Sequence, residues 1–589
     1  MTRTHYVKSG LYGLAPGIDF PAALVAGLLD RFGAAPPDAL ARVTLYVNTT
    51  RMQRRIADLL TAEGARLLPR VRLITELGQS ADADLPPVVP ALRRRLELRQ
   101  LVARLLALQP DLAPPSAAFD LATSLSALLD EMQSEGVGLG AITSLDVTDQ
   151  SGHWARSQKF IALVGTFLTR DDVPGLDPQA RQRQIVQALV ADWQIAPPAD
   201  PVILAGSTGS RGTTALLMRA VAALPQGAVV LPGLDPQMSH ALWRSLGGTA
   251  PQQDHPQYRF ARLAETVGAD PAAIPPWTTG IAPPSAARNA LVSLALRPAP
   301  VTDGWRRDGP KLGDLPEACR GLTLIEAADP RGEALAIALC LRQAVEDGKT
   351  AALITPDRIL TRRVAAALDR WGIEPDDSAG APLRQTAAGR LVRHCAGLAG
   401  QRLGAEPLLV LLKHPLVHAG AGRNRHLLWT RELELHLRRY GPAFPDAAAL
   451  SGWAEKVTRT RHDSGGIQDW ASWVAATCLG HDARDTAPLT DHAAWLIALL
   501  DALSRGPGLP PGDAPAPVWL DDDGTAAQTV LQELADEAAH GGDLDPGEFR
   551  TLIDALLGGE VRSAIRPDPR VMIWGTLEAR VQGADLVVL

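Results

Sequence analysis

The segment Val202-Ile-Leu-Ala-Gly-Ser-Thr-Gly-Ser-Arg-Gly-Thr-Thr214 decides the fold class of this chain. Its first four residues, Val202–Ala205, form an uninterrupted apolar run, which is typical of a strand buried on both faces of a parallel sheet. Glycine, serine and threonine residues then form a turn, and Gly212–Leu224 has a helical pattern. A strand that leads through a short turn into a helix is the unit of α/β folds, so we expect doubly wound parallel layers.

Similar strand signals lie on both sides of this segment. They are short apolar runs bounded by turn residues, at Val43–Val47, Val71–Ile74, Ala228–Leu231, Leu322–Ile325, Ala351–Thr355 and Val571–Trp574. Helical patterns follow two of them, at Arg51–Glu63 and Thr361–Trp371. The alternation extends the α/β prediction over two separate regions of the chain.

Two long stretches lose the strand signals and gain helical periodicity. In the first, we expect helices at Ala91–Leu108, Ala117–Glu135, Trp154–Thr169 and Gln179–Trp193. The second runs from about Arg402 to Gly559. The simplest interpretation is two α/β domains, each interrupted by a mainly helical insertion. The predicted boundaries are 1–90, 91–200 (first insertion) and 201–315 for one domain, and 316–400, 401–565 (second insertion) and 566–589 for the other.

The end of the sequence indicates that the second domain continues. The predicted strand Asp585–Leu589 is followed by no turn, cap or tail. Chain ends are normally exposed and polar, so a strand is an unusual place for one. We therefore expect the chain to be cut inside a domain at Leu589.

Composition excludes several classes of protein. The net charge is −7, so nucleic acid would have to be bound by local basic patches rather than by a global field. The four cysteines, Cys319, Cys340, Cys395 and Cys478, form no CxxC pair, which argues against a zinc site or a disulfide framework and is typical of a reducing cytoplasm. We find no signal peptide and no apolar stretch of membrane-spanning length.

Nucleotide-binding motifs are incomplete. A phosphate loop requires Gly-Lys-Ser/Thr between a strand and a helix, and the glycine-containing turn Ser9–Pro21 has no such lysine. The tripeptide Gly348-Lys349-Thr350 precedes a predicted strand, so it reads as a helix end and turn. Ala205 and Gly206 stand where an ATPase carries the acidic pair that holds Mg²⁺. We therefore predict no catalytic or cofactor-binding residues in this chain.

Segment 205–209 allows a second interpretation. It approximates the GxSxG nucleophile elbow with Ala205 in place of the first glycine, so Ser207 would be the nucleophile of a serine hydrolase. No aspartate or histidine partner can be selected from the sequence. The other readings of this turn, an ordinary capped helix start or a backbone contact to phosphate, are equally compatible with the residues.

Polar and basic turns follow three predicted strands at the sheet edge where α/β folds bind their ligands. Together they could line one groove for a nucleic-acid backbone, although each taken singly reads as a solvated turn. The candidate DNA contacts in these three turns are Arg51, Arg54, Arg55, Thr355, Arg358, Thr576 and Arg580, and the turn after Val202–Ala205 adds Ser207, Ser210, Arg211 and Thr213.

The layout resembles that of superfamily 1 DNA helicases, which have two RecA-like parallel-sheet domains with helical insertions. Thr350–Asp377 is similar to the segment that opens the second motor domain, and Gly575–Leu589 to a later motif in which a turn contacts DNA. The resemblance implies a P-loop NTPase fold. An ATP-dependent helicase in its own right is therefore the alternative function, although it requires the phosphate-loop lysine that we cannot find.

Over its whole length the chain resembles the AddB family of helicase–nuclease subunits, of the alphaproteobacterial type. The strings that carry this are Leu45–Thr49, Ala205–Thr214, Arg288–Pro298, His414–His418 and Ile573–Gly583. The resemblance implies a role in double-strand-break repair by homologous recombination, with an AddA-type helicase–nuclease subunit, DNA ends and the unwound strand as partners. It also implies a later nuclease domain with a divalent metal and, where present, an iron–sulfur cluster, neither of which this segment supplies. ATP would be used by the partner.

Overall fold

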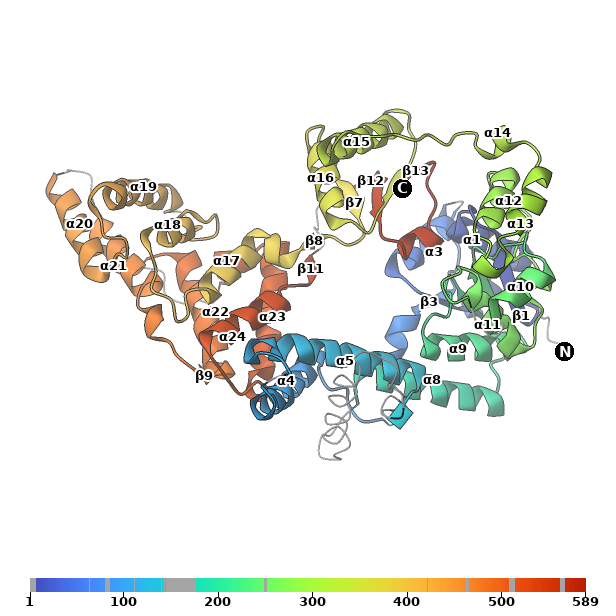
Figure 1. Ribbon diagram of the computed structural model, residues 1–589, viewed down its shortest axis with the longest axis horizontal. Helices are drawn as coiled ribbons and strands as arrows, with labels where there is room; N and C mark the ends of the chain where they lie inside the picture. Colours follow the sequence, from blue (N-terminus) through green and yellow to red (C-terminus); the bar gives the residue numbers. More distant parts are fainter. Residues whose placement is uncertain are drawn as a thin grey trace.

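The computed structural model describes residues 7–62, 64–79, 85–110, 112–138, 140, 141, 144, 176–247, 252–420, 422–460, 465–507, 514–561 and 567–589. These residues form two larger sheets, both entirely parallel, and many helices (Figure 1). The predicted α/β class with parallel sheets is therefore confirmed. None of the helices in these ranges combines the length and apolar character that a membrane span requires.

The first sheet has five strands in the order β1-β5-β4-β2-β3. Its strands are β1 (Gly10–Leu14), β2 (Thr44–Val47), β3 (Arg70–Leu73), β4 (Val202–Ala205) and β5 (Gly227–Pro232). Strands that precede and follow the first long helical stretch thus lie in one sheet. The helices of this part are α1 (Phe20–Phe32), α2 (Pro37–Arg42), α3 (Thr50–Thr61), α9 (Gly212–Ala223), α10 (His240–Gly247), α11 (Tyr258–Val267), α12 (Ala286–Ala295), α13 (Gly304–Asp308) and α14 (Leu315–Ala318).

Strand β4 shows why this sheet is doubly covered. All four of its residues are buried, and successive side chains point to opposite faces. Ile203 and Ala205 pack with α1 and α3, whereas Val202 and Leu204 pack with α9 and α11. Two apolar layers therefore sandwich the sheet, as its uninterrupted apolar sequence predicts.

The first helical insertion contains α4 (Ala91–Leu108), α5 (Ala118–Glu135) and α8 (Pro178–Ile195). Helix α5 links distant parts of the molecule. Near its start, Phe119 is buried in the core of the second helical region. At its end, the Glu135 carboxylate accepts a hydrogen bond from the Gly212 backbone N–H of α9, with a distance of 2.7 Å. Helix α5 therefore connects the core of the second helical region to α9, which covers the first sheet.

The second parallel sheet has four strands in the order β13-β6-β12-β7. They are β6 (Ala351–Ile354), β7 (Pro375–Asp377), β12 (Asp568–Trp574) and β13 (Leu586–Val588). Helices α15 (Pro330–Glu346) and α16 (Arg358–Asp369) pack on β6 and β12 around Leu353, Val364 and Ile573. This apolar cluster is smaller than either of those that cover the first sheet.

The second helical region has its own extensive core. Its helices are α17 (Ala387–Ala396), α18 (Ala405–Lys413), α19 (Arg423–Tyr440), α20 (Ala447–Thr460), α21 (Ile467–Cys478), α22 (Leu489–Arg505), α23 (Asp522–Glu537) and α24 (Pro546–Leu556). Two small antiparallel pairs accompany them, β9 (Ala487–Pro488) with β10 (Asp543–Leu544), and β8 (Ala381–Pro382) with β11 (Glu560–Val561).

The two sheets, each with its helices, and the two helical regions are arranged as a ring in Figure 1. The second sheet is at the top, and α4, α5 and α8 of the first helical insertion are at the bottom. Arg99 of α4 joins the two helical parts, because its guanidinium pairs with Glu548 of α24 at 2.8 Å and also donates to the Gly541 carbonyl. A single apolar core that includes Leu92, Leu96 and Phe119 continues across this junction. The helical parts therefore form one packed body.

Some sequence expectations were wrong. Leu322–Ile325 forms no strand, and Leu324 is 84% exposed, because no described strand lies beside it to pair its backbone. Strand β1 was missed, since its glycines read as a turn. Gly13 is in fact required inside the strand, because a Cβ there would lie 2.3 Å from Leu234 Cδ2. The predicted helix Trp154–Thr169 lies outside the described residues.

Candidate functional site

A cavity of about 410 Å³ separates the carboxyl ends of the two parallel sheets. One wall is the turn after β1, residues 15–18, with Gly233 after β5. The other wall is Ile354 at the end of β6 and the segment from Trp574 to Val587. Its volume is within the range of small-molecule sites, about 300–1,000 Å³, and its position is the one where α/β folds bind ligands.

The start of α1 beside this cavity is occupied by a carboxylate of the chain itself. Asp19 caps the helix by accepting a hydrogen bond from the Ala22 N–H at 3.2 Å. Its other oxygen accepts from Arg55 at 2.6 Å. A helix N-terminus favours an anion, and here Asp19 supplies it. A phosphate group at this position would meet a negative charge in place of a lysine.

The end of β4 is equally closed to metal chemistry. Gly206 adopts a left-handed backbone conformation with φ of 82°. A Cβ at this position would lie 3.0 Å from Met52 Sδ and 3.3 Å from Val581 Cγ1. A side chain there would be strained and crowded, and neither Gly206 nor Ala205 before it supplies a carboxylate. Among the described residues, no group of three or more His, Cys, Asp or Glu is placed to hold a metal ion.

The polar groups that line the cavity are mainly hydrogen-bond donors. Arg580 is the one charged side chain of the described lining. Trp574 Nε1 and Gln582 Nε2 are buried N–H groups without a hydrogen-bond partner in the described part of the chain. This arrangement attracts acceptor groups; the described lining also includes the Thr208 hydroxyl, and none of its residues is an aspartate, glutamate, histidine or cysteine.

The same region forms the joint between the two sheet domains. Val581, which follows β12, is fully buried in the core of the first domain together with Met52 and Ala205. Arg51 of α3 forms an ion pair with Asp376 of β7 at 2.8 Å. An apolar contact and an ion pair beside the cavity therefore connect the two sheets.

The turn after β4 makes mainly internal contacts. The Ser207 hydroxyl accepts a hydrogen bond from the Gly209 N–H at 3.2 Å, a turn contact, and none of the described histidines is bonded to it. Thr213 is buried and donates to the Ser134 carbonyl at 3.0 Å. The Glu135 carboxylate accepts the hydrogen bond from the Gly212 N–H, as described above. Only Ser210 and Arg211 of this turn are exposed.

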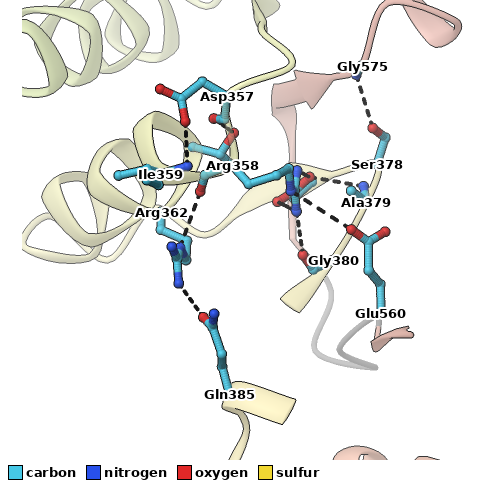
Figure 2. A network of polar contacts seen from close by, with 12 residues as sticks. Asp357, Arg358, Ile359, Arg362, Ser378, Ala379, Gly380, Gln385, Glu560 and Gly575 are labelled. Carbon is cyan, nitrogen blue, oxygen red and sulfur yellow. Dashed lines mark hydrogen bonds and ion pairs between the residues drawn. The ribbon is translucent and has the colours of Figure 1, made fainter. Parts of the chain in front are cut away.

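The turn after β6 is fixed in a similar way, as Figure 2 shows. Asp357 caps α16 by accepting from the Ile359 N–H at 2.7 Å, and its own N–H is held by the Thr355 hydroxyl. Arg358 reaches across to Asp377 at 3.2 Å and to the Gly380 carbonyl at 2.6 Å. The predicted contacts Thr355 and Arg358 thus hold the turn and the strand ends together.

The structure divides the predicted DNA contacts into two groups. Engaged in contacts within the chain are Arg51, Arg55, Ser207, Thr213, Thr355 and Arg358. Exposed on the surface are Arg54, Ser210, Arg211, Thr576 and Arg580, and their three arginines form no ion pair within the described residues. Arg580 lines the cavity, whereas Arg54 lies on α3 and Arg211 at the start of α9.

Sequence reasoning missed Asp19, Val581 and Gln582. An aspartate directly before a Pro-containing helix start is a recognisable cap signal, so Asp19 was detectable. The burial of Val581 in the other domain has no local sequence signal.

Lys349 lies in the exposed turn before β6, at the sheet edge opposite the cavity, with its ammonium group 3.8 Å from Asp347.

The largest histidine pKa shifts lie elsewhere, in the second helical region. Burial lowers the pKa values of His414 and His426 to about 4. His426 is fully buried, with Nε2 2.6 Å from the Leu412 carbonyl, while Nδ1 accepts from Trp470 Nε1 at 3.0 Å. This pattern requires a neutral ring, which suits a structural role.

Comparison with known proteins adds no assignment: no protein-family model matches the chain, and no curated protein matches it.

Proposed function

We propose that this chain is a DNA-binding, helicase-like scaffold subunit of an AddAB-type double-strand-break resection complex, without ATPase activity of its own. The observation that carries the proposal is the Asp19–Arg55 pair at the start of α1, beside the cavity between two parallel sheets. The position has the surroundings of a phosphate site, yet its anion is a side chain of the protein.

Two further features oppose nucleotide hydrolysis. Hydrolysis requires Mg²⁺, which prefers carboxylate ligands, and Ala205 and Gly206 at the end of β4 supply none. Val581 is buried in the first domain, so an apolar contact of the protein itself holds the two sheets together. A motor requires ligand binding to change the relation between its domains, and such a contact opposes that change.

The proposal narrows the DNA contacts at the sheet edges to Arg54, Arg211 and Arg580. These exposed guanidinium groups are available to phosphates, whereas Arg51, Arg55 and Arg358 neutralise carboxylates of the chain. Contacts of this type to the DNA phosphate backbone position a DNA strand without reading its base sequence.

ATP hydrolysis tests the proposal first. We expect the purified chain to hydrolyse no ATP with or without DNA ends, and Lys349→Ala to change nothing. DNA-stimulated hydrolysis should arise when an AddA-type subunit is added. ATP turnover by the chain alone that disappears in Lys349→Ala would overturn the scaffold assignment.

A DNA-binding assay tests the second part of the proposal, that the chain binds DNA ends. In fluorescence anisotropy with a labelled DNA end, Arg54→Ala/Arg580→Ala should bind more weakly and with a smaller salt dependence than the unmodified chain. The matched control is Arg439→Ala/Arg459→Ala, which also removes two exposed arginines, from α19 and α20. Absence of DNA binding by the unmodified chain would contradict the proposed function.

A further inference from the structure

A second pocket lies where the two helical parts meet. Its volume is about 490 Å³, and it is lined by residues of α5, of η6 (Leu383–Gln385), of α17 and of α24. The lining residues that carry charge are Asp120, Arg384, Arg393, Arg550 and Asp554. The pocket thus differs from the cavity between the sheets, where the lining has a single charged side chain.

The charges of this pocket leave two arginines available. Arg393 forms an ion pair with Asp554, so these two charges cancel. Asp120 lies in the first turn of α5, where the helix dipole favours a carboxylate. Arg384 and Arg550 form no ion pair with any described residue, and Arg384 is exposed. In a chain of net charge −7, these two guanidinium groups outnumber the remaining carboxylate of the pocket, Asp120, so the local charge favours an anion.

Basic side chains continue from this pocket toward the second sheet. Arg362 of α16 is hydrogen-bonded to Gln385, the residue after Arg384, as Figure 2 shows. Arg358, one helical turn earlier, lies beside the end of β7. Since Arg358 is paired with Asp377 there, the series of available cations is Arg362, Arg384 and Arg550, from α16 to the helical junction.

We propose that this pocket binds the phosphate backbone of a single nucleic-acid strand, with Arg384 and Arg550 as the contacting groups. The proposal rests on the proposed function, since it assumes that the chain binds DNA. An extended run of cations suits a polymer of phosphates, because each nucleotide of a strand brings one negative charge. A single small anion needs only the pocket and gives no role to Arg362.

The test uses the full chain and a fluorescent single-stranded oligonucleotide in anisotropy titrations at several salt concentrations. Arg384→Ala/Arg550→Ala should weaken binding about tenfold. It should also reduce the slope of log affinity against log salt by about 1.4, because each phosphate contact to a single strand contributes about 0.7. Arg439→Ala/Arg459→Ala is the control and should match the unmodified chain.

Further variants separate a specific contact from misfolding. Arg384→Lys/Arg550→Lys keeps the charges and should restore most of the binding, while thermal unfolding should be equal in all variants. If the unmodified chain binds the strand and Arg384→Ala/Arg550→Ala binds it equally well, this pocket assignment is wrong and the proposed function stands. If the unmodified chain binds no DNA, the proposed function itself fails.

Inorganic phosphate distinguishes the source of the anion. Calorimetry with phosphate alone should give weak binding compared with the oligonucleotide. Phosphate binding that Arg384→Ala/Arg550→Ala abolishes, together with unchanged oligonucleotide affinity, would overturn the nucleic-acid assignment in favour of a small-anion site.

Discussion

The cavity between the two sheets and the pocket between the helical parts use their arginines in different ways. Beside the cavity, Arg51 and Arg55 are paired with Asp376 and Asp19, and the pairs join elements of the fold. In the pocket, Arg384 and Arg550 pair with none of the described residues. The edge where parallel sheets usually bind ligands has thus become a structural joint, and unpaired positive charge lies at the helical junction.

The largest expected effect comes from breaking the joint at Val581. Val581→Asp would place an uncompensated charge in the core of the first domain, which should cost about 3 kcal/mol or more. We expect a clearly lower midpoint of thermal unfolding, measured by tryptophan fluorescence.

Leu577→Asp is the matched control, because Leu577 belongs to the same segment and is 66% exposed. It should leave the midpoint nearly unchanged. Equal midpoints for both variants would mean that the segment does not pack as a joint, and the contrast between the two sites would lose its basis.

An effect of similar size should follow from pH, and its largest part should come from the helical region. The folded-state pKa values of His414 and His426 are lowered to about 4, so the unfolded chain takes up protons first as the pH falls below 6.5. Stability is therefore complete above pH 6.5 and declines down to pH 4. Each ring should account for a loss of about 3 kcal/mol over that window.

Chemical unfolding followed between pH 7 and 4 measures this loss. His414→Asn keeps a side-chain acceptor for the Leu416 N–H but does not titrate in this range, so it should remove the loss of about 3 kcal/mol assigned to that ring. A pH dependence identical to that of the unmodified chain would show that His414 does not remain neutral in the folded state.

The smallest effect separates two neighbouring arginines of α3. Arg51→Ala removes a partly exposed ion pair, so it should lower the stability by about 0.5–1 kcal/mol. A double-mutant cycle with Asp376→Ala measures that coupling. Arg54→Ala should leave stability unchanged and weaken DNA binding. If Arg51→Ala instead weakens DNA binding with no measurable coupling to Asp376, Arg51 belongs with the available cations.

Much of the fold could be predicted because its strands have strong local signals. Val202–Ala205 was placed from its apolar run alone, since a strand buried on both faces needs no polar residue. Strand β1 was missed because its glycines look like turn residues. Gly13 is in the strand because Leu234 approaches it closely, and Leu234 is 221 positions away in the printed sequence. Leu322–Ile325 has a strand composition, but composition cannot supply a neighbouring strand.

The candidate sites were predictable only in part, since a sequence gives positions and not partners. Arg51 was expected at a sheet edge and lies there, but Asp376 is 325 residues away. Arg384 and Arg550 belong to no motif, and only the packing of η6 and α17 beside α24 brings them to one pocket. Charges that are far apart in sequence become a site through tertiary structure alone.

Helix α5 spans about 24 Å between Phe119 in one core and Glu135, which contacts the start of α9, because these residues are sixteen positions apart. One inserted residue would turn the far end by about 100° and remove one of the two contacts. The length of α5 therefore sets the distance between the first sheet and the second helical region. Its exposed sides can vary in sequence, whereas its number of residues cannot change.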